Sequence, residues 1–254
     1  MSLPLDCLIY EWLPPNKPIQ KTKRMDPRKL FADDRMSGFC VYCGGPPETR
    51  DHVPSRVLLD DPPQSNLPVV ACCYTCNQSF SIHEEYLACL LDCVLVGSTQ
   101  PENMTRSKVA KILRKRPALA SRIASSLDTS STTEKTWMPE MDRVRKVILK
   151  LARGHIAYEL SLPHLDDPLS IECAPLCLMA PEEIDAFLRD QSTPFWPEIG
   201  SRAFIRFCED ATSGPMDYWQ VVQAGRYQYL VCQSDGDFLR MLIGNYLACQ
   251  VAWD

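Results

Sequence analysis

Apolar residues recur at helical spacing around residues 87–95, directly after a cysteine-rich and turn-rich segment. This spacing places five apolar side chains on one face and predicts an amphipathic helix. Ser81 followed by Glu84 matches a capping box, so we expect this helix to begin at Ser81. The apolar positions are Leu87, Leu90, Leu91, Val94 and Leu95.

Two further segments, 105–125 and 140–160, are helical in pattern. The first is basic. The second has a long apolar face, which Gly154 is expected to weaken locally because glycine is a poor helix former. A polar linker, 129–137, separates them. The predicted buried positions of the second helix are Val144, Val147, Ile148, Leu151, Ile156 and Leu160.

The pattern changes after about residue 199. Segments 201–210, 217–223, 226–233 and 237–253 are rich in aromatic and β-branched residues, and Gly, Asp and Ser separate them. This composition predicts antiparallel strands. The fold class is therefore α+β, with a helical middle segment and a C-terminal antiparallel β-sheet.

Four regions follow from these patterns: an irregular N-terminal extension (1–38), a cysteine-bounded module (39–97), a basic helical segment (98–160), and an acidic linker leading into the β region (161–254). The longest apolar stretch, from Tyr86 to Ser98, is interrupted by Asp92 and is shorter than the ~20 residues of a membrane span. No basic start precedes an apolar core at the N-terminus, so we expect no secretory signal and a cytoplasmic location.

Four of the 13 cysteines form two C-x2-C knuckles, Cys40–Cys43 and Cys73–Cys76, with 29 residues between the inner cysteines. Two such knuckles can supply four thiolates to one tetrahedral zinc ion, which then has no open position and is structural. Buried or redox-active cysteines are the alternative, and Cys72 could replace Cys73 in register. The remaining cysteines are scattered in apolar stretches and are expected to be small buried residues.

Polar residues with catalytic potential lie within this cysteine frame. Asp51-His52 follows the first knuckle in the string DHVPSR, Asn66 opens the segment NLPVV, and Asn77 follows the last cysteine in CYTCN. Each is common by itself, and Asn77 alone could be an ordinary helix cap. In this order and frame, the residues resemble the HNH (ββα-metal) endonuclease family. The resemblance covers about a fifth of the chain.

The resemblance implies metal-dependent hydrolysis of nucleic-acid phosphodiester bonds, with DNA favoured over RNA. His52 would be the general base. Asp51 and Asn77 would hold a catalytic Mg²⁺ or Mn²⁺ ion, both of which prefer oxygen ligands. Asn66 would orient His52. The sequence has Asn77 where the third family letter is His, and His83 is an alternative ligand on a separate turn.

Charge is segregated along the chain. Residues 101–160 carry 13 Lys and Arg against 6 Asp and Glu, although the whole chain has a net charge of −5. A local basic field attracts phosphate backbones, but a solvated helix face is an equally good interpretation. The candidate nucleic-acid contacts are Arg50, Arg56, Lys108, Lys111, Arg114, Lys115 and Arg116, with a second basic set at Arg143, Arg145, Lys146, Lys150 and Arg153.

Three interpretations therefore remain: an HNH endonuclease, a catalytically inactive zinc-stabilised module that binds nucleic acid or protein, and an effector or toxin nuclease whose C-terminal sheet senses a ligand or partner. The other histidines carry less information. His155 lies in a predicted core helix and is expected to be a satisfied buried residue, and His164 lies in a loop near Asp166 and Asp167.

Overall fold

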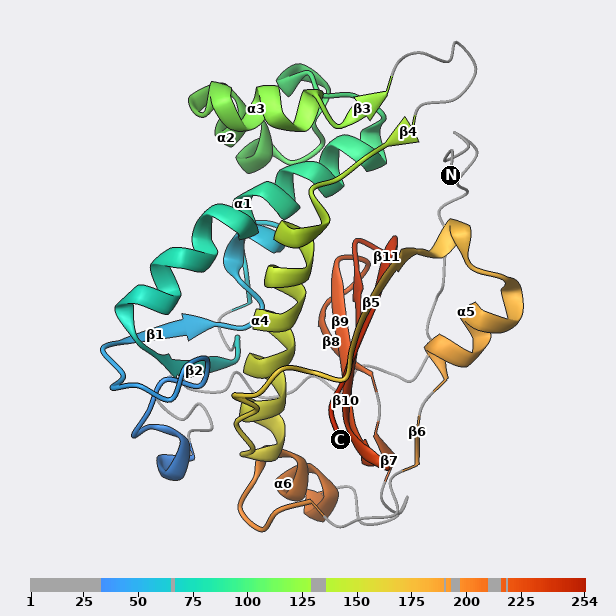
Figure 1. Cartoon of the computed structure of the whole chain (residues 1–254). Coiled ribbons are helices and arrows are strands. Elements are labelled where there is room, and N and C mark those ends of the chain that lie inside the picture. Colours follow the sequence, from blue (N-terminus) through green and yellow to red (C-terminus); the bar gives the residue numbers. More distant parts are fainter. Residues whose placement is uncertain are drawn as a thin grey trace.

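The structure is a computed structural model, and it describes residues 33–64, 67–128, 136–189, 191–192, 197–209, 216–217 and 219–254. It contains mixed helices and strands (Figure 1). The predicted extension 1–38 lies outside the described residues except for its last part, which includes the 3-10 helix η2 (Asp34–Met36).

The cysteine-bounded module forms a strand–strand–helix unit. Strands β1 (Thr49–His52) and β2 (Val69–Cys72) pair antiparallel, and Asp51 lies opposite Val70. A 3-10 helix, η3 (Arg56–Leu58), follows β1, and helix α1 (Tyr74–Val96) follows β2 directly. Gly97 ends α1 in the left-handed conformation that favours glycine.

The predicted start of this helix was wrong. Helix α1 begins at Tyr74, because Cys73 is its N-cap and the Cys73 Sγ accepts the backbone N–H of Cys76 at 3.3 Å. Ser81 lies inside the helix, where its hydroxyl donates to the carbonyl of Gln78. The second cysteine knuckle therefore provides the helix start that sequence patterns assigned to Ser81.

The basic segment forms two helices instead of one. Helix α2 (Ser107–Lys115) is followed by α3 (Pro117–Ala124), because Pro117 starts a new helix and restricts the backbone of Arg116. A short 3-10 helix, η4 (Pro101–Asn103), precedes them. Strands β3 (Leu127–Asp128) and β4 (Thr136–Trp137) then pair across the predicted polar linker, most of which lies outside the described residues.

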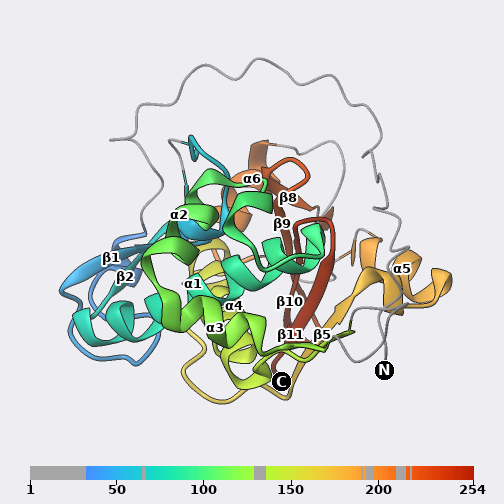
Figure 2. The same ribbon diagram turned by 90° about the horizontal axis from the view of Figure 1, so that it is seen from above.

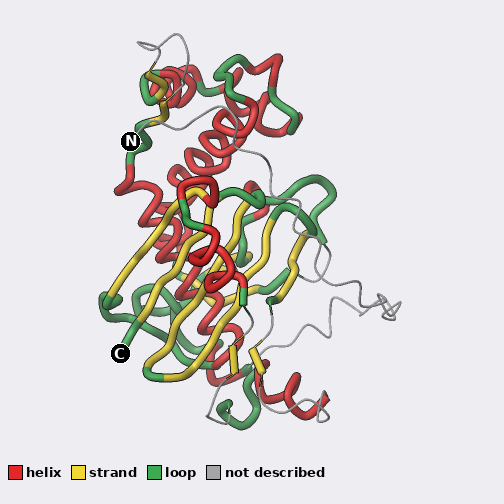
Figure 3. Tube along the Cα trace, turned by 90° about the vertical axis from the view of Figure 1, so that its right-hand side faces the viewer, coloured by secondary structure: helices red, strands yellow, loops and turns green. Residues whose placement is uncertain are grey.

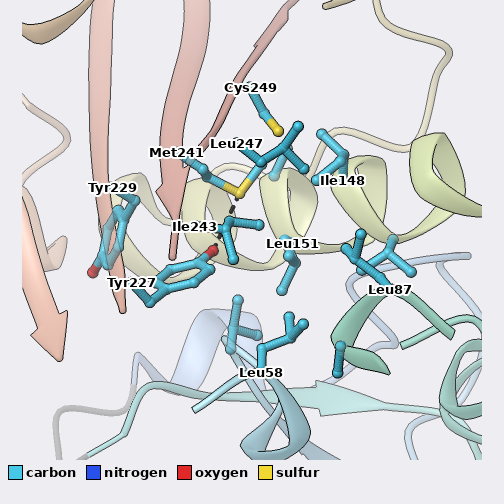
Figure 4. Close-up of a cluster of buried hydrophobic side chains, with 14 of the residues drawn as sticks. Leu58, Leu87, Ile148, Leu151, Tyr227, Tyr229, Met241, Ile243, Leu247 and Cys249 are labelled. Carbon is cyan, nitrogen blue, oxygen red and sulfur yellow. Dashed lines mark hydrogen bonds between the residues drawn. The ribbon is translucent and has the colours of Figure 1, made fainter. Parts of the chain in front are cut away.

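Helix α4 (Met141–Leu160) is the central element of the fold. It lies between α1 and the large sheet, as Figure 1 shows, and Figure 2 gives the same arrangement from above. All six predicted apolar positions of this helix are buried. Figure 4 shows Ile148 and Leu151 of α4 in one cluster with Leu87 of α1 and with Ile243 and Leu247 of the sheet. A single apolar cluster thus joins the module to the rest of the chain.

Five strands form the large antiparallel sheet in the order β5-β11-β10-β9-β8 (Figure 3). Their bounds are β5 (Ser170–Pro175), β8 (Gln220–Gln223), β9 (Tyr227–Ser234), β10 (Gly236–Ile243) and β11 (Leu247–Ala252). Met241 and Ile243 face α4, whereas Leu242 packs on the other face with Ile184 and Phe187 of α5 (Pro181–Leu188). The antiparallel C-terminal sheet was therefore predicted correctly.

Two local predictions in this half were wrong. The acidic linker contains the edge strand β5, with η5 (Leu176–Leu178) after it. Segment 201–210, expected to be a strand, forms helix α6 (Arg202–Glu209), because the Ser201 hydroxyl caps the N–H of Phe204 and its aromatic residues also fit helical spacing. Short strands β6 (Gln191–Ser192) and β7 (Met216–Asp217) pair nearby. None of the helices in the described ranges combines the length and the apolar character needed to cross a membrane.

Candidate metal centre and hydrolytic site

The four predicted zinc ligands lie close together in one cluster. The Sγ atoms of Cys40, Cys43, Cys73 and Cys76 all lie within 4.8 Å of one another. A tetrahedral zinc ion with bonds of about 2.3 Å needs sulfur–sulfur distances of about 3.8 Å. Cys43 Sγ and Cys73 Sγ are 3.8 Å apart. The cluster could therefore bind a structural metal ion such as zinc.

The two knuckles shape this cluster through the backbone. Gly44 turns the first knuckle with a φ of 75°, and its N–H donates to the carbonyl of Cys40 at 2.8 Å. Burial raises the pKa of the Cys40 thiol, but backbone N–H groups of both knuckles outweigh it and bring the pKa to about 7. Cys72, the alternative ligand, donates to the Cys73 carbonyl at 3.1 Å and is not part of the cluster.

Strand β1 divides the candidate catalytic residues between its two faces. Successive side chains of a strand alternate, so Thr49 and Asp51 share one face, and Arg50 and His52 share the other. Asp51 is buried, whereas Arg50 is exposed and His52 is half-buried. This alternation places Asp51 and His52 on opposite faces of the strand.

Asp51 belongs to a buried charge network. Lys150 Nζ of α4 lies 2.6 Å from Asp51 Oδ2 and 2.5 Å from Glu84 Oε1 of α1. The Tyr42 hydroxyl donates to the same Asp51 Oδ2 at 2.8 Å. Burial opposes the charge of Lys150, but the carboxylates of Glu84 and Asp51 outweigh it and raise the pKa of Lys150. The assignment of Lys150 to a basic surface was wrong, because only 1% of its side chain is exposed.

Gly154 explains how α4 comes close enough to build this network. A Cβ atom at this position would lie 2.7 Å from Val53 Cγ2 and 3.2 Å from the Tyr42 hydroxyl. Real side chains do not tolerate such a contact, so glycine allows α4 to pack directly on the segment after β1. Gly154, which was expected only to weaken the helix, therefore allows the close contact between α4 and Val53.

His52 faces Arg56 on the other side of β1. His52 Nε2 is 2.6 Å from an Nη of Arg56, so Nε2 must be the acceptor and the proton is on Nδ1. His52 Nδ1 is buried and has no partner among the described residues, and Asn66, the expected partner, lies outside them. Burial and the Arg56 charge lower the pKa of His52. The imidazole is therefore neutral at neutral pH.

Asn77 lies in the first turn of α1, and its Nδ2 donates to Thr49 Oγ1 at 3.2 Å. Since Thr49 and Asp51 share a face of β1, Asn77 is held on the Asp51 side, with its amide oxygen unused by this contact. His83 lies six residues further along the same helix and therefore on a later turn than Asn77. Its Nδ1 lies 3.4 Å from an Nη of Arg143.

The loop after His52 is fixed by a pair of buried arginines that sequence reasoning missed. Arg106 donates to the carbonyl of Val57 at 2.7 Å, and Arg226 donates to that of Leu58 at 3.0 Å. Both guanidinium groups contact Asp92 Oδ1, at 3.4 and 2.9 Å. Asp92, which interrupts the apolar stretch of α1, was the one available signal. Three distant segments thus hold the backbone of η3, which follows His52 in the chain.

Some of the basic candidate residues form ion pairs with nearby carboxylates, and others form none within the described part of the chain. Lys108 pairs with Asp61 at 2.7 Å, Arg116 with Glu85 at 3.0 Å, and Arg114 with Glu102 at 3.5 Å. Lys111 and Lys115 are exposed, and neither forms an ion pair among the described residues. In the second set, Arg143 pairs with Glu140, and Arg153 donates to two backbone carbonyls. Much of the apparent basic excess is therefore neutralised locally.

The other histidines have structural surroundings. His155 is fully buried, its Nε2 is 2.9 Å from the Tyr227 hydroxyl, and its ring stacks on Tyr229. Its Nδ1 has no partner within the described residues, so it is only partly satisfied. His164 Nε2 pairs with Asp237 at 2.8 Å. Among the scattered cysteines, Cys89, Cys93, Cys232 and Cys249 are buried as predicted, whereas Cys208 is exposed.

No protein-family model, curated protein or solved structure matches this chain. The site must therefore be interpreted from its own geometry.

Proposed function

We propose that this protein is a nuclease of the HNH type that hydrolyses nucleic-acid phosphodiester bonds, with DNA favoured as the substrate and His52 as the general base. The observation that carries the proposal is the neutral His52 beside Arg56 at the edge of a strand–strand–helix unit flanked by the cysteine cluster. The order of cysteines, DH and Asn77 along this unit is that of the family it resembles.

In the proposed reaction, His52 Nε2 takes a proton from a water molecule that attacks phosphorus, the bond from phosphorus to the 3′-oxygen breaks, and the departing oxygen takes a proton from solvent. The lone pair of Nε2 faces Arg56 in the free protein, so the guanidinium group must turn away before the base can act. A scissile phosphate provides the reason, because a guanidinium group binds phosphate oxygens in a bidentate manner. Exposed Arg50, on the same face of β1, would be a second phosphate contact. General-base catalysis typically contributes ~10²–10⁴ in rate.

The expected Mg²⁺ or Mn²⁺ ion on Asp51 and Asn77 fits this arrangement poorly. Asp51 Oδ2 already accepts from Lys150 and Tyr42, and Lys150 supplies positive charge at the position that an ion would need. The Asn77 amide oxygen remains available. We therefore assign no step of the reaction to an ion on Asp51. The structural zinc of the cysteine cluster has a separate role.

The test is cleavage of plasmid, single-stranded DNA and RNA by purified zinc-loaded protein, with Mg²⁺, with Mn²⁺ and after EDTA treatment. We expect cleavage by the parental protein and loss of at least ~10² in rate for His52→Ala. His83→Ala is the matched control, since His83 is also a partly buried histidine beside an arginine. Equal cleavage by His52→Ala and the parent would refute the assignment.

The alternative is a zinc-stabilised binding module without activity. The observation that favours it is the internal ion pair of Asp51, which a metal-dependent nuclease would need to open. Under this alternative the protein binds nucleic acid or another protein, and no metal condition gives cleavage that His52→Ala abolishes.

A further inference from the structure

Two acidic side chains converge in the interior next to the proposed site. Asp51 comes from β1 and Glu84 from α1, and both are almost fully buried. Buried carboxylates that face each other repel, and a divalent cation between them is a common solution because Mg²⁺ and Mn²⁺ prefer carboxylate oxygens. In this protein, the two facing oxygens instead lie 2.6 Å and 2.5 Å from the ammonium group of Lys150.

We propose that Lys150 takes the place of a divalent cation between Asp51 and Glu84, so that Asp51 is not a metal ligand in the folded protein. Lys150 is then a positioning residue. It holds the inner face of β1 against α4 and thereby places His52 on the outer face of the same strand.

The surroundings of Lys150 keep its ammonium group at this position. The Lys150 side chain extends from the central helix α4. Its Nζ lies 5.8 Å from the ring centre of Tyr42 and 6.0 Å from that of Phe80. Aromatic faces at this distance attract a cation. Gly154, one helical turn further along α4, allows the close approach that brings Nζ to Asp51. An ion bound at Asp51 Oδ2 would meet the like charge of Lys150 at short range.

For its functional meaning, this inference rests on the proposed nuclease. It excludes a divalent ion on Asp51 as the cofactor of that site. The charge of the substrate phosphate would be balanced by Arg50 and Arg56 on the outer face. Its test measures ion binding, so it can succeed or fail whether or not cleavage is observed.

The first arm uses the parental zinc-loaded chain and the ring signals of its 4 histidines in NMR spectra. Paramagnetic Mn²⁺ broadens nearby signals, and His52 is the neighbour of Asp51 in sequence. We expect one equivalent of Mn²⁺ to leave the His52 signal no broader than those of His83 and His164. Selective broadening of His52 that disappears in Asp51→Asn would overturn the proposal.

The second arm creates the site that Lys150 fills. Lys150→Met keeps the apolar stem and removes the charge, so the two carboxylates should gain one Mn²⁺ per chain, with selective broadening of His52 and a Tm that rises with Mn²⁺ concentration. The matched control, Lys150→Met with Asp51→Asn, should gain neither. A folded Lys150→Met variant that acquires no Mn²⁺ would also contradict the proposal. If this variant does not fold, the parental arm decides by itself.

Discussion

Gly154→Ala tests whether the close packing of α4 is what builds the interior of the site. Alanine is a better helix former than glycine by about 1 kcal/mol, so helix propensity alone predicts a more stable protein. Packing predicts the opposite. The new Cβ would lie 2.7 and 3.0 Å from the two methyl groups of Val53, which is fully buried, and 3.2 Å from the Tyr42 hydroxyl.

The packing term should exceed the propensity term. Forcing an extra methyl group into a filled interior costs typically about 1–3 kcal/mol, because the neighbours must shift together. Val53 cannot rotate away alone, since its two methyl groups are both in contact. We therefore expect Gly154→Ala to lower the free energy of unfolding by up to about 2 kcal/mol, the packing cost less the propensity gain.

Urea unfolding of the zinc-loaded protein measures this difference. The matched control is the pair Lys146→Ala and Lys146→Gly on the exposed face of the same helix, which isolates propensity and should favour alanine by about 1 kcal/mol. If Gly154→Ala is as stable as the parent, or more stable, α4 does not approach Val53 as closely as described here. The absence of a side chain at Gly154 would then not be what brings Lys150 to Asp51.

The remaining predictions concern the metal, charge and protons. Cys76→Ser should give unstable protein with less than one zinc per chain by elemental analysis, since such sites fold with their metal; a stable, zinc-free parent would rule the centre out. Neutralising Lys111 and Lys115 should weaken nucleic-acid binding and reduce its log–log salt slope by up to about 0.9 per lost phosphate contact, whereas neutralising Arg145 and Lys146 should change it less; equal effects would contradict a specific face. Burial lowers the pKa of His52 and, much further, that of His155. Below pH about 6.5 the unfolded chain therefore binds protons that the folded chain does not, and the free energy of unfolding should fall as pH falls from 7 to 5, by up to about 1.4 kcal/mol per pH unit for each such proton. A free energy of unfolding that stays constant from pH 7 to 5 in urea titrations would contradict the burial of these two histidines.

Local patterns were sufficient for much of the fold. The buried face of α4 follows from apolar periodicity, and the strands β9, β10 and β11 follow from aromatic and β-branched composition between turn residues. Both signals depend only on neighbours in sequence. The pattern failed where another contact decided the outcome. The Cys73 cap in the second cysteine knuckle places the start of α1 at Tyr74, and a Ser201 cap favours helix α6 in a segment rich in aromatic residues. The edge strand β5 needed β11 as a partner, which no local signal shows.

The candidate site also contains features that local sequence predicts and features that depend on tertiary contacts. Cysteine spacing was enough to predict the cluster, because two tight turns determine where four sulfur atoms can point. The Lys150–Glu84 pair joins residues 66 positions apart, and the Arg226–Asp92 pair joins residues 134 positions apart. A lysine in an amphipathic basic helix looks the same in sequence whether it faces solvent or a buried carboxylate. Only the tertiary packing of α4 distinguishes the two.

The two faces of β1 limit what the site can do. On the inner face, two carboxylates, Asp51 and Glu84, face the single ammonium group of Lys150, and all three side chains are buried, so that face does not attract a phosphate group. On the outer face, His52 is neutral and Arg56 and Arg50 are exposed, so an anion is attracted to the side where a base is available. Any hydrolysis must therefore take place on the outer face. Replacing the inner residues should act on that chemistry only by moving the strand that carries His52.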